Sequence, residues 1–237
     1  MTPPTNATWT DFWQQKNAFD QSMSMNYAYF LDRVEQHVTL TPQTTVLDVG
    51  SGPGHLADAW HSRVGTLVCL DISKRYNDLV RARHAAHPNV VVHDLPADNF
   101  LDFSVLQNQT FDLVVVMSVL QYYPNIEAVE TLLLTLKRHA KPGATILLCD
   151  LIVGEGMLRD VVSVLGRSLR QGRLWHMLTL LFRLRFSAYY GIRQQNGFLI
   201  IPAQDWLALC QRLGLRAHFL PHPITMQQDR LTLRIDC

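Results

Sequence analysis

The residues most clearly suited to binding a ligand form a glycine-rich loop, which ends the sequence TVLDVGSGPG at residues 45–54. The first half of this stretch is apolar and β-branched, which is typical of a buried strand. Three glycines alternate in the second half: Gly50, Gly52 and Gly54. Glycine permits tight turns and lets the backbone approach a ligand without an intervening Cβ. Residues 55–60 are predicted as a helix, so the loop amides and the helix N-terminus should face a nucleotide-type ligand.

The spacing of this loop argues against a dinucleotide. The fingerprint G-x-G-x-x-G would place its third glycine at the position of His55. Asp48 lies two residues before Gly50, where a carboxylate would repel a pyrophosphate. The same carboxylate can accept hydrogen bonds from a cationic or amine-bearing ligand, directly or through water. The alternative interpretation is a glycine turn in an unrelated α/β domain.

Two further acids follow apolar strands. Asp71 lies about 20 residues beyond Gly50, the separation at which a βαβ unit offers a carboxylate to a ribose diol. The alternative, a strand-end aspartate that caps the next helix, fits Ser73 better than Asp71. Asp94 also ends a strand and can accept a hydrogen bond from an adenine amine, with Leu95 as an apolar wall. For Asp94 the alternative is an ordinary aspartate at a strand end.

Strands and helices alternate along the first two thirds of the chain. We expect strands at 45–49, 65–72, 90–96, 111–118 and 145–151, and helices at 55–60, 74–86 and 126–140, with a turn at 141–144. This order predicts an α/β fold with a Rossmann-like, doubly wound, mostly parallel sheet. Right-handed crossovers bring the strand ends to one edge. Polar residues should therefore converge there: Asp48, Asp71, Asp94, Ser118 and Asp150.

The two ends of the chain add elements to this core. An aromatic helix is expected to open at Thr10 or Asp11, and a second helix covers 26–38. Their aromatic residues could be core or could close over a ligand. A later helix at 202–214 is followed by two strands, 215–220 and 230–235, which should form an antiparallel pair.

Over residues 40–152 the order of these features resembles the class I S-adenosylmethionine-dependent methyltransferases, in their small-molecule branch. The resemblance implies S-adenosylmethionine as the cofactor and S-adenosylhomocysteine as the product. It places Asp71 at the ribose hydroxyls and Ile72 against the adenine ring. The remaining implied cofactor residues are the following: Asp48, Gly50, Ser51, Gly52 and Gly54 at the methionine part, Asp94 and Leu95 at the adenine, and Met117 and Ser118 near the sulfonium.

The chain departs from this family at one catalytic position. Many small-molecule members carry His where Gln121 stands, and the Asn/Asp-Pro-Pro-Tyr/Trp tetrad of many amino-methylating nucleic-acid enzymes is absent. The acidic edge of the sheet and the apolar insertion at residues 154–201 favour methyl transfer to a hydroxyl or carboxyl oxygen of a small molecule, with N- or C-methylation as alternatives. A hydroxyl nucleophile gains from a base. Candidates for a base or a positioning group are Asp150, Tyr122, His176 and Tyr190, each with an ordinary structural alternative.

Three regions are expected. Residues 1–40 form helices that close over the cofactor site, residues 41–153 and 202–237 form the core, and residues 154–201 form a helical lid insertion. The insertion holds seven arginines against two acidic residues. It is interpreted as packed helices with a solvated arginine face, as a basic mouth for an anionic or carrier-bound acceptor, or as a membrane-surface contact.

Composition narrows the function further. A net charge of +1 argues against a dedicated nucleic-acid binder, and the four cysteines lack the spacing of a zinc site. No leader or membrane-spanning run is recognised, so we expect a cytoplasmic protein without a bound metal. A nicotinamide dehydrogenase is disfavoured, because neither Tyr76 nor Tyr122 has a lysine four residues later. A non-catalytic protein that binds the same cofactor remains the competing class.

Overall fold

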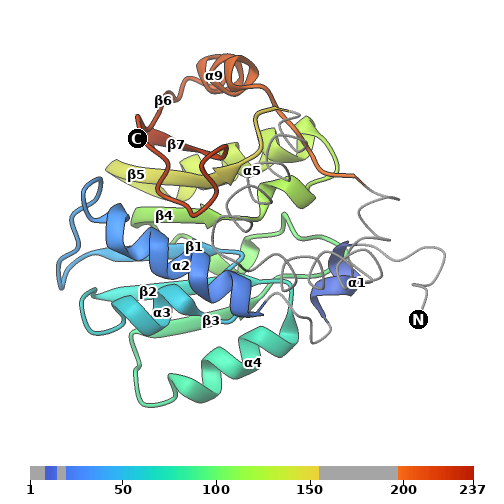
Figure 1. The fold of residues 1–237 in the computed structure, drawn as a ribbon. Coiled ribbons are helices and arrows are strands. Elements are labelled where there is room, and N and C mark those ends of the chain that lie inside the picture. The colour runs from blue at the N-terminus through green and yellow to red at the C-terminus, as the bar shows by residue number, and fades with distance from the viewer. Residues whose placement is uncertain (1–8, 15–19, 155–196) are drawn as a thin grey trace, which may run out of the picture.

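A computed structural model describes residues 9–14, 20–154 and 197–237 of the chain (Figure 1). Within these residues, seven strands form one sheet in the order β3-β2-β1-β4-β5-β7-β6. β1 to β5 run parallel, and β7 is antiparallel to both β5 and β6. The predicted doubly wound sheet with an antiparallel C-terminal pair is confirmed. The strand bounds are Thr45–Val49 (β1), Thr66–Asp71 (β2), Val90–Asp94 (β3), Phe111–Met117 (β4), Ala140–Leu151 (β5), Arg216–Phe219 (β6) and Leu231–Asp236 (β7).

Helices cover both faces of this sheet (Figure 1). Successive residues of a strand point to opposite faces. Accordingly, Val46 of β1 packs in the core beneath α2 and α3, whereas Leu47 packs in the core beneath α5 and α9. The helices are α1 (Trp9–Trp13), α2 (Asp20–Val34), α3 (His55–Trp60), α4 (Lys74–Arg83), α5 (Ile126–His139) and α9 (Ala203–Arg212), with short 3-10 turns η1 (Ser104–Leu106) and η2 (Leu120–Tyr122).

Two predicted boundaries were wrong. The helix expected at 26–38 is α2, which starts at Asp20 and ends at Val34, because the backbone then tightens into turns such as Gln36 N to Arg33 O at 3.1 Å. The turn expected at 141–144 is instead part of β5. Gly143 keeps a turn-like φ of 83°, but its amide donates to the Cys237 carbonyl at 2.7 Å, so the edge of the sheet holds this segment as an irregular strand.

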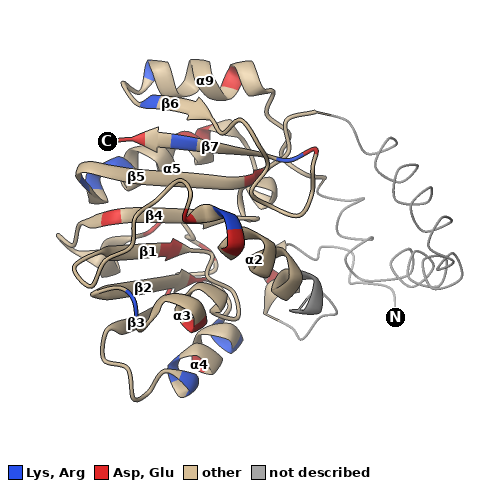
Figure 2. Cartoon of the chain, turned by 60° about the vertical axis from the view of Figure 1, so that its left-hand side comes forward, with Lys and Arg blue, Asp and Glu red and all other residues tan. Residues whose placement is uncertain are grey.

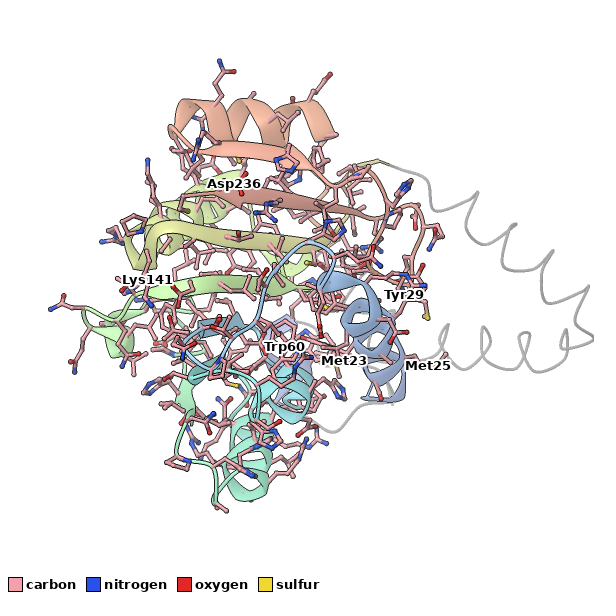
Figure 3. All side chains as sticks on the ribbon, turned by 90° about the vertical axis from the view of Figure 1, so that its left-hand side faces the viewer. Met23, Met25, Tyr29, Trp60, Lys141 and Asp236 are labelled. Carbon is pink, nitrogen blue, oxygen red and sulfur yellow. The ribbon has the colours of Figure 1, made fainter. Side chains whose placement is uncertain are left out.

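The acidic strand ends do meet at one edge of the sheet. Asp71 lies in register beside Asp94, and Asp48 lies one residue before the end of β1. Asp48 is the single charged residue of β1 and is the red stretch on that strand in Figure 2. Lys141 and Asp236 lie at the other ends of the strands, on the side of the sheet away from Met23 and Met25 of α2 (Figure 3).

The N-terminal helices approach this acidic edge. Phe30 of α2 packs against Trp60 of α3 with 6.4 Å between ring centroids, which anchors α2 over the sheet (Figure 3). Most of the predicted insertion at 154–201 lies outside the described residues, and so do His176 and Tyr190. The three-region division of the chain therefore stays a prediction.

Candidate cofactor pocket and active site

One pocket opens at the carboxyl ends of β1, β2 and β4, where parallel α/β sheets place their ligand sites. Many of the residues singled out in the sequence line it: Gly50, Gly52, Asp71, Ile72, Leu95, Met117, Ser118 and Tyr122. Other predicted residues do not line it: Asp48, Ser51, Gly54, Asp94 and Asp150. Residues that the sequence did not single out as site residues complete the lining, among them Trp9, Asn26, Tyr76, Phe100 and Tyr123.

The glycine loop shows two distinct uses of glycine. Gly50, Gly52 and Gly54 all have positive φ, at 72°, 51° and 84°. A Cβ on Gly50 would meet Val119 Cγ2 at 2.2 Å, and one on Gly54 would meet Val80 Cγ2 at 2.6 Å. Gly50 and Gly54 are therefore required by packing. A Cβ on Gly52 would have nothing within 4 Å, and Gly52 lines the pocket, so its missing side chain leaves room for a ligand.

Asp71 connects the loop to the next helix. One carboxylate oxygen accepts the amide of Gly52 at 2.8 Å, and the other accepts the amide of Ser73 at 2.7 Å. Ser73 is the N-cap residue of α4, but its hydroxyl donates to the Trp13 carbonyl at 2.7 Å instead of capping the helix. Burial raises the pKa of Asp71 to about 6, although these amides favour the carboxylate. Each oxygen keeps a second lone pair, which suits the two hydroxyls of a diol.

Asp48 is fully buried, and among the described residues neither of its oxygens has a hydrogen-bond partner. Burial, and to a lesser extent the charge of Asp71, raises the pKa of Asp48 to about 8. A buried acid without partners is costly in its charged form. Such a group is poised to gain a cationic partner.

Asp94 and Leu95, which were both predicted at the adenine, separate in the structure. Leu95 is buried and lines the pocket, and its amide donates to the Asp71 carbonyl at 2.9 Å. The Asp94 carboxylate turns toward α4, where it accepts from Asn77 at 2.7 Å and from Arg81 at 2.9 Å. Only Leu95 of this pair contributes to the pocket wall, so the adenine role of Asp94 stays a prediction.

Ser118 and Asp150 form a polar pair at the ends of β4 and β5. The Ser118 hydroxyl donates to Asp150 Oδ2 at 2.7 Å, and Ser118 lines the pocket while Asp150 lies buried behind it. Burial raises the pKa of Asp150, against the opposing effects of Arg230 and Ser118. Gln121, at the position where family members carry His, donates through its amide to the Ser118 carbonyl at 2.9 Å. Gln121 thus fixes the backbone of Ser118.

Asn26 reaches this pair from α2. Its amide nitrogen lies 3.4 Å from Ser118 Oγ, and its oxygen accepts the Met226 amide at 2.8 Å. A buried polar residue within the apolar stripe of a helix was the available sequence signal. Only the aromatic residues of this helix were considered from the sequence, as core or as a cover over a ligand.

With this geometry established, comparison with known families decides the assignment. Residues 46–143, which run from β1 into the start of β5, match the family described as a methyltransferase domain. This part of the chain thus resembles a methyltransferase domain, and the fold of the described residues is the one found in solved methyltransferases. The matched range contains the glycine loop, Asp71 and Ser118, whereas Asn26 and Asp150 lie outside it.

Three individual proteins illustrate what the chain is similar to. The chain is 34% identical over 160 residues to chondramide synthase cmdD of Chondromyces crocatus; the match covers 66% of this chain but 4% of that protein. It superimposes on a putative O-methyltransferase of Nostoc punctiforme with a TM-score of 0.63 and 14% identity, over 100% of this chain and 63% of that one. The N-methyltransferase NodS of Bradyrhizobium japonicum, in complex with S-adenosylhomocysteine, gives a TM-score of 0.51 and 14% identity, over 97% and 93%.

The residues of the pocket fit S-adenosylmethionine, the cofactor of this family. In the lining, Asp71 offers a carboxylate that matches a diol, and Gly52 leaves room for a ligand. Behind this lining lies Asp48, a buried acid without a hydrogen-bond partner among the described residues. Among the described residues, no three His, Cys, Asp or Glu side chains are arranged to hold a metal ion. None of the helices in the described part of the chain is long and apolar enough to span a membrane.

Proposed function

We propose that this protein transfers a methyl group from S-adenosylmethionine to an oxygen of a small molecule. The observation that supports this most strongly is the hydrogen bond from Ser118, at the pocket wall, to the buried carboxylate of Asp150. A neutral hydroxyl must lose its proton when it is methylated, and a serine bonded to a carboxylate offers that proton a path. A neutral amine can attack without prior deprotonation and has less need of such a path.

The cofactor would be held by the residues whose chemistry fits it. Asp71 would accept the ribose hydroxyls, and Ile72 and Leu95 would pack against the adenine. The open side of Gly52 would leave room for the methionine part of the ligand. Asp48, buried behind the lining, would accept a hydrogen bond from the ammonium group directly or through water. When bound, S-adenosylmethionine supplies an electrophilic methyl group on a sulfonium.

The chain itself contributes alignment and proton transfer. In the proposed reaction the acceptor hydroxyl donates to Ser118 Oγ. As the oxygen gains its methyl group, its proton passes to Ser118 Oγ, and the serine proton passes to Asp150 Oδ2. Asn26 also donates to Ser118 Oγ and helps to hold it in place. Holding the nucleophile in line is worth about 7–11 kcal/mol in favourable cases, so positioning by these residues would account for much of the rate.

Transfer of label from methyl-labelled S-adenosylmethionine tests this proposal. The full chain is incubated with the labelled cofactor and a cell extract, and low-mass products, including carrier-bound acyl chains, are analysed by mass spectrometry. The proposal predicts an O-methyl product whose rate of formation falls by about 100-fold or more with Asp150→Asn. Label on nitrogen or carbon would contradict the oxygen acceptor. Cofactor binding without any label transfer would indicate a non-catalytic binding protein.

A further inference from the structure

Strand β5 is irregular at the residue that faces Ser118. Between two regular pairs of β5 with β7, two residues of β5, Cys149 and Asp150, lie opposite a single residue of β7, Thr232. This arrangement is a β-bulge, which disturbs the hydrogen-bond ladder and re-aims a side chain. Asp150 takes its positive φ of 66° at the bulge, and its carboxylate accepts from the Ser118 hydroxyl. The bulge therefore sets the direction of the Asp150 side chain.

Arg230 lies beside this bulge, directly before the first residue of β7. Its Nη1 donates to the backbone carbonyl of Asp150 at 3.3 Å, so the arginine side chain supports the strand where the ladder is disturbed. The same guanidinium acts on the carboxyl group. Burial is the largest influence on the pKa of Asp150 and raises it, whereas the positive charge of Arg230 lowers it.

The other groups around this carboxyl supply no positive charge. Asp229 is exposed, and its negative charge opposes that of Arg230. Ser118 of β4 and Thr225 of the loop before β7 are neutral neighbours. The thiol of Cys149 is buried, and burial raises its pKa, so it is neutral as well. Of the neighbours named here, Arg230 is the one that favours the ionised carboxylate through its charge.

The segment that carries Arg230 also supports the other member of the pair. The Met226 amide donates to Asn26 Oδ1 at 2.8 Å, and the Asn26 amide nitrogen lies 3.4 Å from Ser118 Oγ. Residues 226–230 thus contact Asp150 directly and Ser118 through Asn26. Two attachments on one short segment fix the position of the carboxylate relative to the hydroxyl.

We propose that Arg230 is a positioning residue for methyl transfer, which holds the bulge of β5 so that the Asp150 carboxylate faces Ser118. This inference rests on the proposed function and adds a residue to it. Arg230 is not part of the described pocket lining, so it acts through Asp150 and not on the cofactor. Its charge also favours the ionised carboxylate, which is the form that can accept the serine proton.

NMR of the Asp150 carboxyl tests this without any acceptor. The full chain, isotope-labelled at the aspartate Cγ atoms and saturated with S-adenosylhomocysteine, is titrated with pH. The signal of Asp150 is identified by its loss in Asp150→Asn. We expect its titration midpoint to move to higher pH in Arg230→Gln, because the neighbouring positive charge is removed. Arg230→Lys keeps the charge and should return the midpoint most of the way.

Controls make this titration specific. Arg216→Gln removes an exposed arginine of β6, which pairs with the far end of β7 at Asp236, and should leave the midpoint unchanged. Arg230→Met provides a second neutral variant if Arg230→Gln folds poorly. An unchanged or lower midpoint in the neutral Arg230 variants would overturn the inference.

Methyl transfer gives the second readout. In Arg230→Gln the rate of label transfer to low-mass products should fall about tenfold or more, because the carboxylate is misplaced, whereas S-adenosylhomocysteine should bind within about twofold of the unmodified chain. A loss of cofactor binding equal to the loss of rate would overturn the positioning role. If the unmodified chain transfers no label, the proposed function fails, and the titration still decides whether Arg230 controls Asp150.

Discussion

The Ser118 hydroxyl donates to Asp150 at 2.7 Å, and both residues hold their backbone in the left-handed region, with φ of 56° and 66°. Residues with a Cβ rarely adopt this conformation, because it costs roughly 1–2 kcal/mol each. Two neighbouring parallel strands thus end in the same strained geometry and aim their side chains at one another. Strain of this kind is retained where surrounding structure over-determines it, often at functional sites.

Removing either member of this pair should slow methyl transfer far more than it weakens cofactor binding. Ser118→Ala and Asp150→Asn should each lower kcat by about 100-fold or more, the usual loss when acid–base catalysis is removed. Binding of S-adenosylhomocysteine, measured by calorimetry, should stay within about twofold. Asp98→Asn, which changes an exposed aspartate, serves as the control. Unchanged turnover in Asp150→Asn would remove Asp150 from the mechanism.

The rate should depend on pH through Asp150. Burial raises the pKa of this carboxyl, and only its ionised form can accept the proton from Ser118. Activity should therefore be lost as pH falls, with an inflection above the ordinary aspartate value of about 4. The check is a profile of kcat at saturating cofactor. The residual activity of Asp150→Asn should lack this inflection, and a profile that is identical in both proteins would assign the inflection to another group.

Two glycines provide a matched comparison of strain and ligand space. Gly52 and Gly143 both have positive φ and both have nothing within 4 Å of a built Cβ, but only Gly52 lines the pocket. Gly52→Val and Gly143→Val should lower the unfolding free energy similarly, by about 1–2 kcal/mol or somewhat more for a branched side chain. Only Gly52→Val should abolish binding of S-adenosylhomocysteine. Equal cofactor affinity in the two variants would place the ligand elsewhere.

Asp48 should trade stability for binding. Its pKa is raised to about 8 in the folded chain, so the folded state holds a proton that the unfolded state loses near pH 4. The unmodified chain therefore loses stability as pH rises from about 4 to 8. At pH 8, Asp48→Asn should raise the unfolding free energy by on the order of a few kcal/mol, and the Tm should rise with it. At pH 4 the substitution should change the Tm little. The same variant should bind S-adenosylhomocysteine more weakly. A lower Tm for Asp48→Asn than for the unmodified chain at pH 8 would contradict this, because it would show that the fold stabilises the charged form of Asp48.

The sequence predicted the parts of the site that depend on strand order. The alternation of strands and helices brings Asp71 and Ser118 to one edge whatever the details of packing, and the glycine pattern marks the loop between them. Side-chain direction was less accessible. Asp94 lies where it was expected along the chain, but Arg81 and Asn77 of α4 hold its carboxylate, and this depends on how α4 packs against β3.

Contacts between distant segments were the least predictable. Asn26 belongs to the site because α2 lies over the sheet edge and because the loop at Met226 fixes its amide, two facts of tertiary packing. Phe100 and Tyr123 meet for a similar reason, since one follows β3 and the other follows β4. Ser118 lines the pocket itself, whereas Asp150, the predicted base, lies behind it and reaches the pocket only through its hydrogen bond with Ser118.

Calorimetric titration of the full chain with S-adenosylhomocysteine tests the central claim most directly. The account predicts saturable binding at one site, and a loss of about tenfold or more in affinity with Asp71→Ala, because two hydrogen bonds to a charged group are removed. No binding at millimolar ligand, or binding that Asp71→Ala leaves unchanged, would contradict it.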